Sequence, residues 1–254
     1  MWNLAVSFLV GTRSFQVCVF DGRSVGDSTE CTGFSIKDLA NDALLLLDHL
    51  GWSDNVYLVA YSLGGMVAQN MVLMAPHNRF RSVALINTAA KGWFTRWFPP
   101  LNTLWKFLLA GLGFIPLKTT TDLISFMLST TFPKKWLAQK PTWTNEFLTN
   151  HEFMTKYVIA RSAGKTRQTS KGRAAQSAAV WTHGLTVKEL KSIGTKTKLF
   201  IFSGRKDEMI RASNSDYLVK YTGGTSIRYE DCGHALFEQE FERFHKQLLE
   251  EVLI

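Results

Sequence analysis

The chain has 254 residues, 46% of them hydrophobic and 20% charged, with three cysteines and a formal net charge of +8. This composition excludes a disordered chain and a small disulfide scaffold, because it can bury a full apolar core and has few cysteines. No run of 18 or more uncharged apolar residues predicts a membrane span, and the N-terminus lacks the basic start and cleavage site of a secretory signal. We therefore expect a cytoplasmic protein, either soluble or peripherally attached to a membrane, in a reducing compartment.

The first predicted elements are a strand and a helix. The apolar run Gln16–Phe20 predicts a buried strand. Ser35 and Asp38 have the spacing of a capping box, in which two side chains bond the free backbone groups at a helix start. Apolar residues then recur at helical spacing as far as Gly51, where glycine ends the helix.

The next segment predicts a strand, a tight turn and a helix. The apolar run Val56–Val59 leads into Ala60–Gly65, with the sequence Ala-Tyr-Ser-Leu-Gly-Gly, and an apolar-periodic stretch begins at Met66. This is the setting of a nucleophile elbow, G-x-S-x-G, with Ala60 in place of the first glycine. Small residues are needed because the serine backbone is strained and neighbouring side chains would collide. Taken alone, an ordinary strand-to-helix turn explains the pattern equally well.

Polar residues follow two later strands. After a strand at Val83–Ile86, the strand Leu199–Phe202 leads to Asp207, and Ile227–Tyr229 leads to His234. Open parallel sheets collect their active-site groups just past the carboxyl ends of strands. The alternation of strands and helices predicts a mostly parallel sheet with helices on both faces.

With Ser62 in the elbow and Asp207 and His234 after two later strands, the chain resembles the α/β-hydrolase family, in its esterase/lipase-like branch, from about Trp2 to the C-terminus. The order Ser, Asp, His is the one expected for this architecture. The resemblance implies that Ser62 is the nucleophile, His234 the general base and Asp207 the group that orients the imidazole. It also implies that the backbone N–H of Leu63 contributes to the oxyanion hole.

Each of these residues has an ordinary alternative: a turn serine, a surface histidine and an aspartate that caps a helix. Glu230 and Asp231 are nearer to His234 in sequence, and Asp216 follows Asp207 in the next helix. We prefer Asp207 as the acid, because sequence neighbours on one loop seldom point their side chains at each other productively.

The N-terminal part of the family pattern is incomplete. Asp21–Ser28 is similar to the family segment D-x-R-G-x-G-x-S, and residues 2–10 resemble the helix that follows the family's oxyanion loop. The family's preceding strand and loop, which supply a second oxyanion donor, have no counterpart, so we expect a sheet without its N-terminal strands. Losing one such donor costs on the order of 100- to 1000-fold in kcat. A catalytically impaired protein that binds a ligand, a partner or a membrane surface is therefore the alternative function.

The long stretch between two predicted strands indicates an insertion. By resemblance we expect residues 1–90 and 195–254 to form the hydrolase core and 91–194 a helical cap. One stretch of the cap either lines an acyl-sized pocket, sits in a membrane interface or simply packs the cap on the core. Its large apolar residues are Trp93, Phe94, Trp97, Phe98, Leu101, Leu104, Trp105, Phe107, Leu108 and Leu109.

Positive charge is concentrated in one region. From Phe153 to Lys198 there are ten Lys or Arg residues and one acid, Glu189. Within it, the polar segment Ser162–Ala178 predicts a solvated loop. Such a patch can attract an anionic membrane, or it is a plain solvated face. It lacks interleaved aromatic residues, so we expect no nucleic acid partner.

The resemblance predicts a serine hydrolase that cleaves carboxylic esters through an acyl-enzyme and without a cofactor, and the aromatic stretch of the cap favours lipid-like acyl esters. The six histidines are scattered, so we expect no metal site. A serine at the elbow argues against the epoxide hydrolase and dehalogenase branches, which use a carboxylate nucleophile. The peptidase, thioesterase and cofactor-free peroxidase branches share the triad and stay open, as does the oligomeric state.

Overall fold

The computed structural model describes residues 2–91, 103, 105, 106, 108, 109, 115, 117–164, 166 and 168–253. Its centre is a parallel sheet of four strands in the order β1-β2-β3-β4. The strands predicted at the elbow, after it, and before Asp207 and His234 are confirmed. They are β1 (Val56–Tyr61), β2 (Phe80–Ile86), β3 (Lys198–Gly204) and β4 (Thr225–Tyr229).

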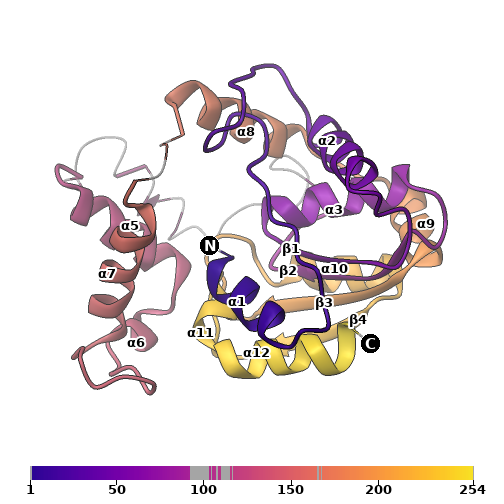
Figure 1. Ribbon diagram of the computed structural model, residues 1–254. Coiled ribbons are helices and arrows are strands. Elements are labelled where there is room, and N and C mark those ends of the chain that lie inside the picture. Colours follow the sequence, from indigo (N-terminus) through magenta and orange to yellow (C-terminus); the bar gives the residue numbers. More distant parts are fainter. Residues whose placement is uncertain are drawn as a thin grey trace.

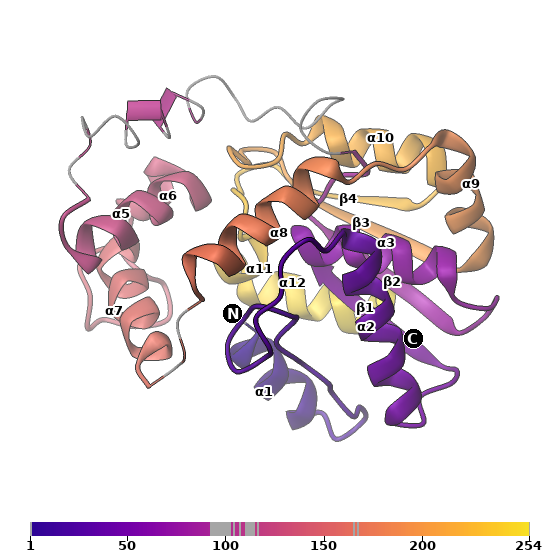
Figure 2. The same ribbon diagram turned by 90° about the horizontal axis from the view of Figure 1, so that it is seen from above.

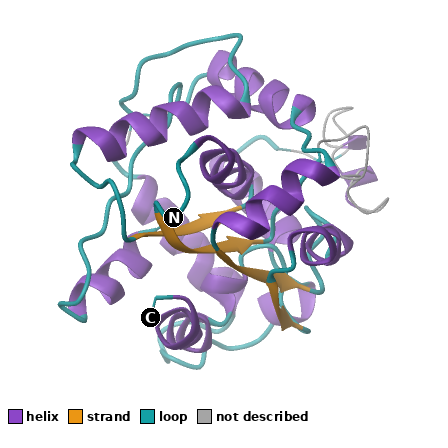
Figure 3. Cartoon of the chain, turned by 90° about the vertical axis from the view of Figure 1, so that its right-hand side faces the viewer, coloured by secondary structure: helices purple, strands orange, loops and turns teal. Residues whose placement is uncertain are grey.

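The sheet separates two hydrophobic cores, and Figure 3 shows helices on both sides of it. Successive side chains of a strand point to opposite faces. In β2, Val83 and Leu85 therefore enter one core, while Ala84 and Ile86 enter the other. All four are fully buried, which explains why β2 has no polar residue in this stretch.

The helices that pack on the sheet form two groups. On the first face lie α2 (Ile36–His49), α3 (Leu63–Met74), α9 (Val187–Lys196) and α10 (Ser213–Thr222). On the second lie α1 (Asn3–Gly11), α11 (Leu236–Gln239), α12 (Phe241–Gln247) and the π-helix η1 (Leu248–Val252). The predicted capping box of α2 is confirmed, and Gly51 follows this helix with φ of 72°.

Apart from these two groups, three further helices lie to one side of the sheet in both Figure 1 and Figure 2. They are α5 (Thr120–Thr131), α6 (Lys134–Leu137) and α7 (Asn150–Ser162). From there the chain returns through α8 (Ser170–Thr182), which packs on the first core through Ala175 and Ala179. The division into a core and a cap at residues 91–194 stays a prediction. Most of the aromatic stretch 93–109 lies outside the described residues.

The strand predicted at Gln16–Phe20 is wrong. This segment has no regular secondary structure, and Val19 and Phe20 are half exposed. A strand needs a hydrogen-bonded neighbour, and in the described part of the chain the sheet begins at β1, which pairs only with β2. Part of the segment is still buried, because Val17, together with the preceding Phe15, packs on the second core. No described helix is long and apolar enough to cross a membrane.

The loop predicted at Ser162–Ala178 is also wrong, because α8 begins at Ser170. Its start is capped by the side chain of Thr169, which accepts a hydrogen bond from the N–H of Gly172. Small residues spaced along one face, Gly172, Ala175 and Ala179, are buried. Polar composition therefore hid a helix whose inner face is made of small rather than large apolar residues.

The buried histidine at the end of α8 predicts a pH dependence of stability. His183 is 8% exposed, and its burial lowers its pKa from 6.5 to about 4. Because only the unfolded chain binds a proton there between these values, the stabilising contribution is complete above pH 6.5 and falls as the pH drops toward 4. His183→Gln should reduce the loss of unfolding free energy between pH 7.5 and 5 by about 2 kcal/mol, at ~1.4 kcal/mol per pH unit.

Urea unfolding at several pH values measures this difference. His77→Gln, at an exposed histidine, should keep the wild-type pH dependence. Equal slopes for the wild type and His183→Gln would contradict the expectation.

Candidate active site

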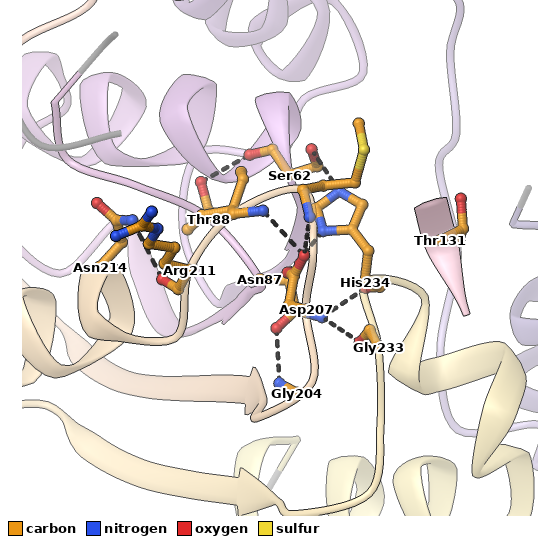
Figure 4. Close-up of polar contacts among 12 residues, drawn as sticks. Ser62, Asn87, Thr88, Thr131, Gly204, Asp207, Arg211, Asn214, Gly233 and His234 are labelled. Carbon is orange, nitrogen blue, oxygen red and sulfur yellow. Dashed lines mark hydrogen bonds and ion pairs between the residues drawn. The ribbon is translucent and has the colours of Figure 1, made fainter. Parts of the chain in front are cut away.

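Three side chains from three strand ends form one hydrogen-bonded chain (Figure 4). Ser62 follows β1, Asp207 lies three residues beyond β3, and His234 lies five residues beyond β4. The Nε2 atom of His234 is 3.1 Å from Ser62 Oγ, and its Nδ1 atom is 2.7 Å from Asp207 Oδ2. The structure thus brings together the three residues proposed from sequence, whose catalytic roles stay a prediction.

The carboxylate of Asp207 determines the protonation pattern of this chain. A carboxylate only accepts hydrogen bonds, so Nδ1 of His234 carries the proton and Nε2 presents its lone pair to the Ser62 hydroxyl. Asp207 Oδ1 accepts from the N–H groups of Met209 and Ile210, at 2.7 and 2.8 Å. Asp207 and His234 are each 5% exposed. The carboxylate is therefore held from two sides and shielded from water.

The backbone of Ser62 has the strain expected at a nucleophile elbow. Its φ of 53° and ψ of −120° lie where side-chain-bearing residues are rarely found. Its N–H donates to the carbonyl of Ile86 at 2.9 Å, and its own carbonyl accepts from the hydroxyl of Thr88 at 2.6 Å. Strand β2 and the residues just beyond it therefore hold both sides of the serine.

Leu63, the predicted oxyanion residue, is the first residue of α3. The first N–H groups of a helix have no partner within it, and they carry the positive end of the helix dipole. Leu63 is half-buried and directly follows the serine in the chain. This placement suits the stabilisation of a negative oxygen, and the oxyanion role stays a prediction.

The loops after β3 and β4 touch each other along their backbones. Lys206 N–H donates to the carbonyl of Cys232 at 2.9 Å. A Cβ atom placed on Gly204 would lie 2.3 Å from the carbonyl oxygen of Gly233. Only glycine allows this approach, which brings the Asp207 loop against the His234 loop.

An aromatic column, which the sequence reasoning missed, packs on the catalytic-type histidine. The ring of Tyr61 lies 4.8 Å from that of His234 and 4.9 Å from that of Phe237, and Phe237 stacks on Trp2 at 5.3 Å. Burial raises the pKa of Tyr61 well above its usual range, so this hydroxyl stays neutral. No motif marks these rings, since aromatic residues are common in any core.

The helices beside the sheet contact the His234 loop and the short helix α11 that follows it. The carbonyl of Thr131, at the end of α5, accepts the backbone N–H of His234 at 2.8 Å. Arg161 of α7 pairs with Glu238 of α11 at 3.1 Å. Burial raises the pKa of Glu238, and Arg161 counteracts this shift. The His234 loop is therefore packed between the sheet and these helices.

The other acids considered from sequence lie elsewhere. Asp231 is 83% exposed and pairs with Lys206, and Asp216 pairs with Arg205 and Arg228. Glu230 is exposed. Within the described ranges, no three His, Cys, Asp or Glu side chains are grouped to hold a metal ion.

Comparison with known proteins gives the family. A sequence profile of the alpha/beta hydrolase fold matches residues 3–241, and the chain therefore belongs to the α/β-hydrolase fold family. No curated protein matches the chain. A hydrolase from Pseudomonas aeruginosa is similar, with a TM-score of 0.70 and 24% identity, over 98% of this chain and 83% of that one.

Two further solved structures share the fold. The enol-lactonase of Burkholderia xenovorans has a TM-score of 0.71 and 20% identity, over 98% of this chain and 84% of that one. An esterase from Exiguobacterium antarcticum has a TM-score of 0.68 and 19% identity, over 91% of this chain and 79% of that one.

The two glycines after the serine should respond differently to alanine. A Cβ atom on Gly65 would lie 2.6 Å from the Thr88 side chain, whereas one on Gly64 would meet nothing within 4 Å. Gly65→Ala should lower the free energy of unfolding by about 1–3 kcal/mol through overpacking. Gly64→Ala should leave it unchanged or raise it by up to about 1 kcal/mol, because alanine favours a helix.

Urea denaturation of both variants decides the matter. If Gly65→Ala were as stable as Gly64→Ala, the close packing of Thr88 against the elbow would be refuted.

Proposed function

We propose that this protein is a serine hydrolase that cleaves carboxylic esters through an acyl-enzyme. The observation that carries the proposal is the continuous chain from Ser62 Oγ through His234 to Asp207, at 3.1 and 2.7 Å. A nucleophile, a base within reach of it and a group that orients the base are the features of activated-serine catalysis. The strained elbow at Ser62 supports it further.

The proposed mechanism follows from the tautomer of His234, which carries its proton on Nδ1 and leaves Nε2 free to accept one. The Ser62 hydroxyl attacks the ester carbonyl while Nε2 of His234 takes its proton, and Asp207 stabilises the imidazolium that forms. The N–H of Leu63 binds the developing oxyanion. His234 then gives the proton to the leaving alcohol, which leaves Ser62 acylated. Water, deprotonated by His234, releases the acid and regenerates the serine.

Esters are the preferred substrate class. The enol-lactonase and the esterase that share the fold are both named for cleaving ester bonds, a lactone being a cyclic ester. The rings of Trp2, Phe237 and Tyr61 beside His234 belong to the second core, and Phe237 is only 2% exposed, so they support the histidine rather than line a substrate site. The proposal of lipid-like acyl esters within this class rests on the aromatic stretch predicted in the cap.

A fluorophosphonate probe tests the nucleophile. Such probes react covalently with an activated serine, so the wild type should be labelled and Ser62→Ala should not. Asp207→Asn should lower the kcat for ester hydrolysis by about 10⁴-fold, because the wrong tautomer of the His234 imidazole is then favoured. Ser53→Ala, at an exposed serine, serves as the control and should be labelled like the wild type.

Equal labelling of the wild type and Ser62→Ala would refute the assignment. A folded, cooperatively unfolding protein that is not labelled and does not hydrolyse short or long p-nitrophenyl esters would favour a binding protein instead.

We further propose that the helices α5–α7 contact anionic membrane surfaces. Large apolar side chains are exposed there, among them Met127 at 51%, Leu148 at 82% and Ile159 at 47%. Residues 117–164 also carry six Lys or Arg against three Asp or Glu. Exposed apolar groups with a surplus of positive charge suit the interface of an anionic bilayer.

Vesicle sedimentation tests this contact. The protein should bind phosphatidylserine-containing vesicles more than phosphatidylcholine vesicles, and less at high salt, because charge attraction is screened. The double variant Lys134→Glu/Lys135→Glu should bind less than Lys37→Glu/Lys220→Glu, which makes the same charge change at exposed sites outside both α5–α7 and the basic region 153–198. Binding indifferent to lipid charge and salt would overturn the proposal.

A further inference from the structure

Asn87 is a fully buried polar residue directly after β2, and no motif singles it out. It is 2% exposed and has a φ of 43°, a backbone conformation that asparagine tolerates better than most residues. Burying an amide side chain is unfavourable unless its hydrogen bonds are made. The hydrogen-bond partners of this side chain should therefore explain why a polar residue is buried here.

The amide of Asn87 is bonded at both ends (Figure 4). Its Nδ2 group donates to the carbonyls of Gly233 and His234, at 3.1 and 2.5 Å. Its Oδ1 atom accepts the N–H of Gly204 at 2.8 Å. The reverse orientation of the amide would place its oxygen against two carbonyl oxygens, so these contacts define the orientation.

These bonds link the loops that carry the acid and the base. Gly204 ends β3 and precedes Asp207 by three residues, while Gly233 and His234 belong to the loop after β4. The backbone of His234 is thereby held on both sides, its carbonyl by Asn87 and its N–H by the carbonyl of Thr131. One side chain thus spans the ends of three neighbouring strands.

From this geometry we infer that Asn87 is a positioning residue, which keeps the imidazole of His234 in line with Asp207 and Ser62. It does not touch the reacting atoms; it acts through the backbone of the two loops. A displacement of a catalytic group by about 1 Å can cost about 100-fold in rate. The expected effect on rates rests on the proposed function, whereas the positioning of the His234 imidazole by Asn87 does not depend on it.

Asn87→Asp is the most informative variant. Aspartate keeps the size, tolerates the backbone conformation and still accepts from Gly204, but an ionised carboxylate cannot donate to the two carbonyls. We expect the rate of fluorophosphonate labelling and the kcat for a p-nitrophenyl ester to fall about 100-fold, with little change in KM. The ratio of variant to wild-type kcat/KM should rise as the pH falls, because a protonated carboxyl group can again donate one hydrogen bond.

Asn78→Asp is the matched control. Asn78 precedes β2 as Asn87 follows it, also with a positive φ, but its side chain is exposed at the other end of the strand. This variant should keep the wild-type rate and pH profile. If Asn87→Asp fails to fold, Asn87→Gly, which accepts the same backbone conformation, takes its place.

A spectroscopic readout separates this inference from the proposed function. The proton between His234 Nδ1 and Asp207 should give a low-field ¹H resonance in the wild type that is absent from His234→Gln and is shifted or lost in Asn87→Asp. If folded Asn87→Asp keeps both the resonance and the labelling rate of the wild type, the positioning role is overturned while the hydrolase assignment stands. If the wild type is not labelled at all, the hydrolase assignment fails, and the low-field resonance alone tests the positioning role. A resonance that is unchanged in Asn87→Asp would overturn that role, whereas a shifted or missing resonance would support it.

Discussion

The contact between the loops that follow β3 and β4 is the constraint on which the rest of the site depends. These two strands run parallel and are paired up to Gly204 and Tyr229, so their loops leave the sheet at the same edge. The carbonyl oxygen of Gly233 lies only 2.3 Å from the position that a Cβ atom on Gly204 would take. Because of this approach, Asp207 and His234 meet at 2.7 Å although 27 positions separate them in the chain.

Strand β2 links this pair to the serine. It lies between β1 and β3, so the residues that follow it, Asn87 and Thr88, lie between the elbow and the two loops. Thr88 bonds the carbonyl of Ser62, and Asn87 bonds the carbonyl of His234. Strain such as that at Ser62 costs of order 1–3 kcal/mol and persists only where the surroundings determine the backbone. The bonds from β2 supply that determination.

The elements with a strong local signal were predictable from sequence. The capping box at Ser35 and the elbow strand and helix at Ser62 each combine periodicity with a residue type that local physics favours there. Asp207 was preferred over its neighbours on an argument about loop geometry, and it is the acid that contacts His234. Sequence was sufficient to predict an element where residues close together in the chain determine its conformation.

The failures share one cause, which is dependence on a distant partner. Gln16–Phe20 has the composition of a strand, but strands are made by their neighbours, and none of the described segments pairs with it. The helix α8 is stabilised by small residues that fit a close contact, and composition does not reveal that contact. Asn87 was missed for the same reason, because a polar residue after a strand is ordinary and only its three partners, remote in sequence, make it informative.

The helices α5 and α7 also hold the segment that carries His234. Thr131 at the end of α5 holds the N–H of His234, and a Cβ atom on Gly233 would lie 2.4 Å from the same carbonyl oxygen. Arg161 of α7 pairs with Glu238, four residues after the histidine. The partial burial of this pair, at 21% and 10% exposure, makes its separation costly, since Arg161 is the partner that offsets the burial of the Glu238 carboxylate. Under the proposed mechanism these helices therefore do more than flank the site, because α5 supplies one of the two hydrogen bonds that hold the backbone of the general base.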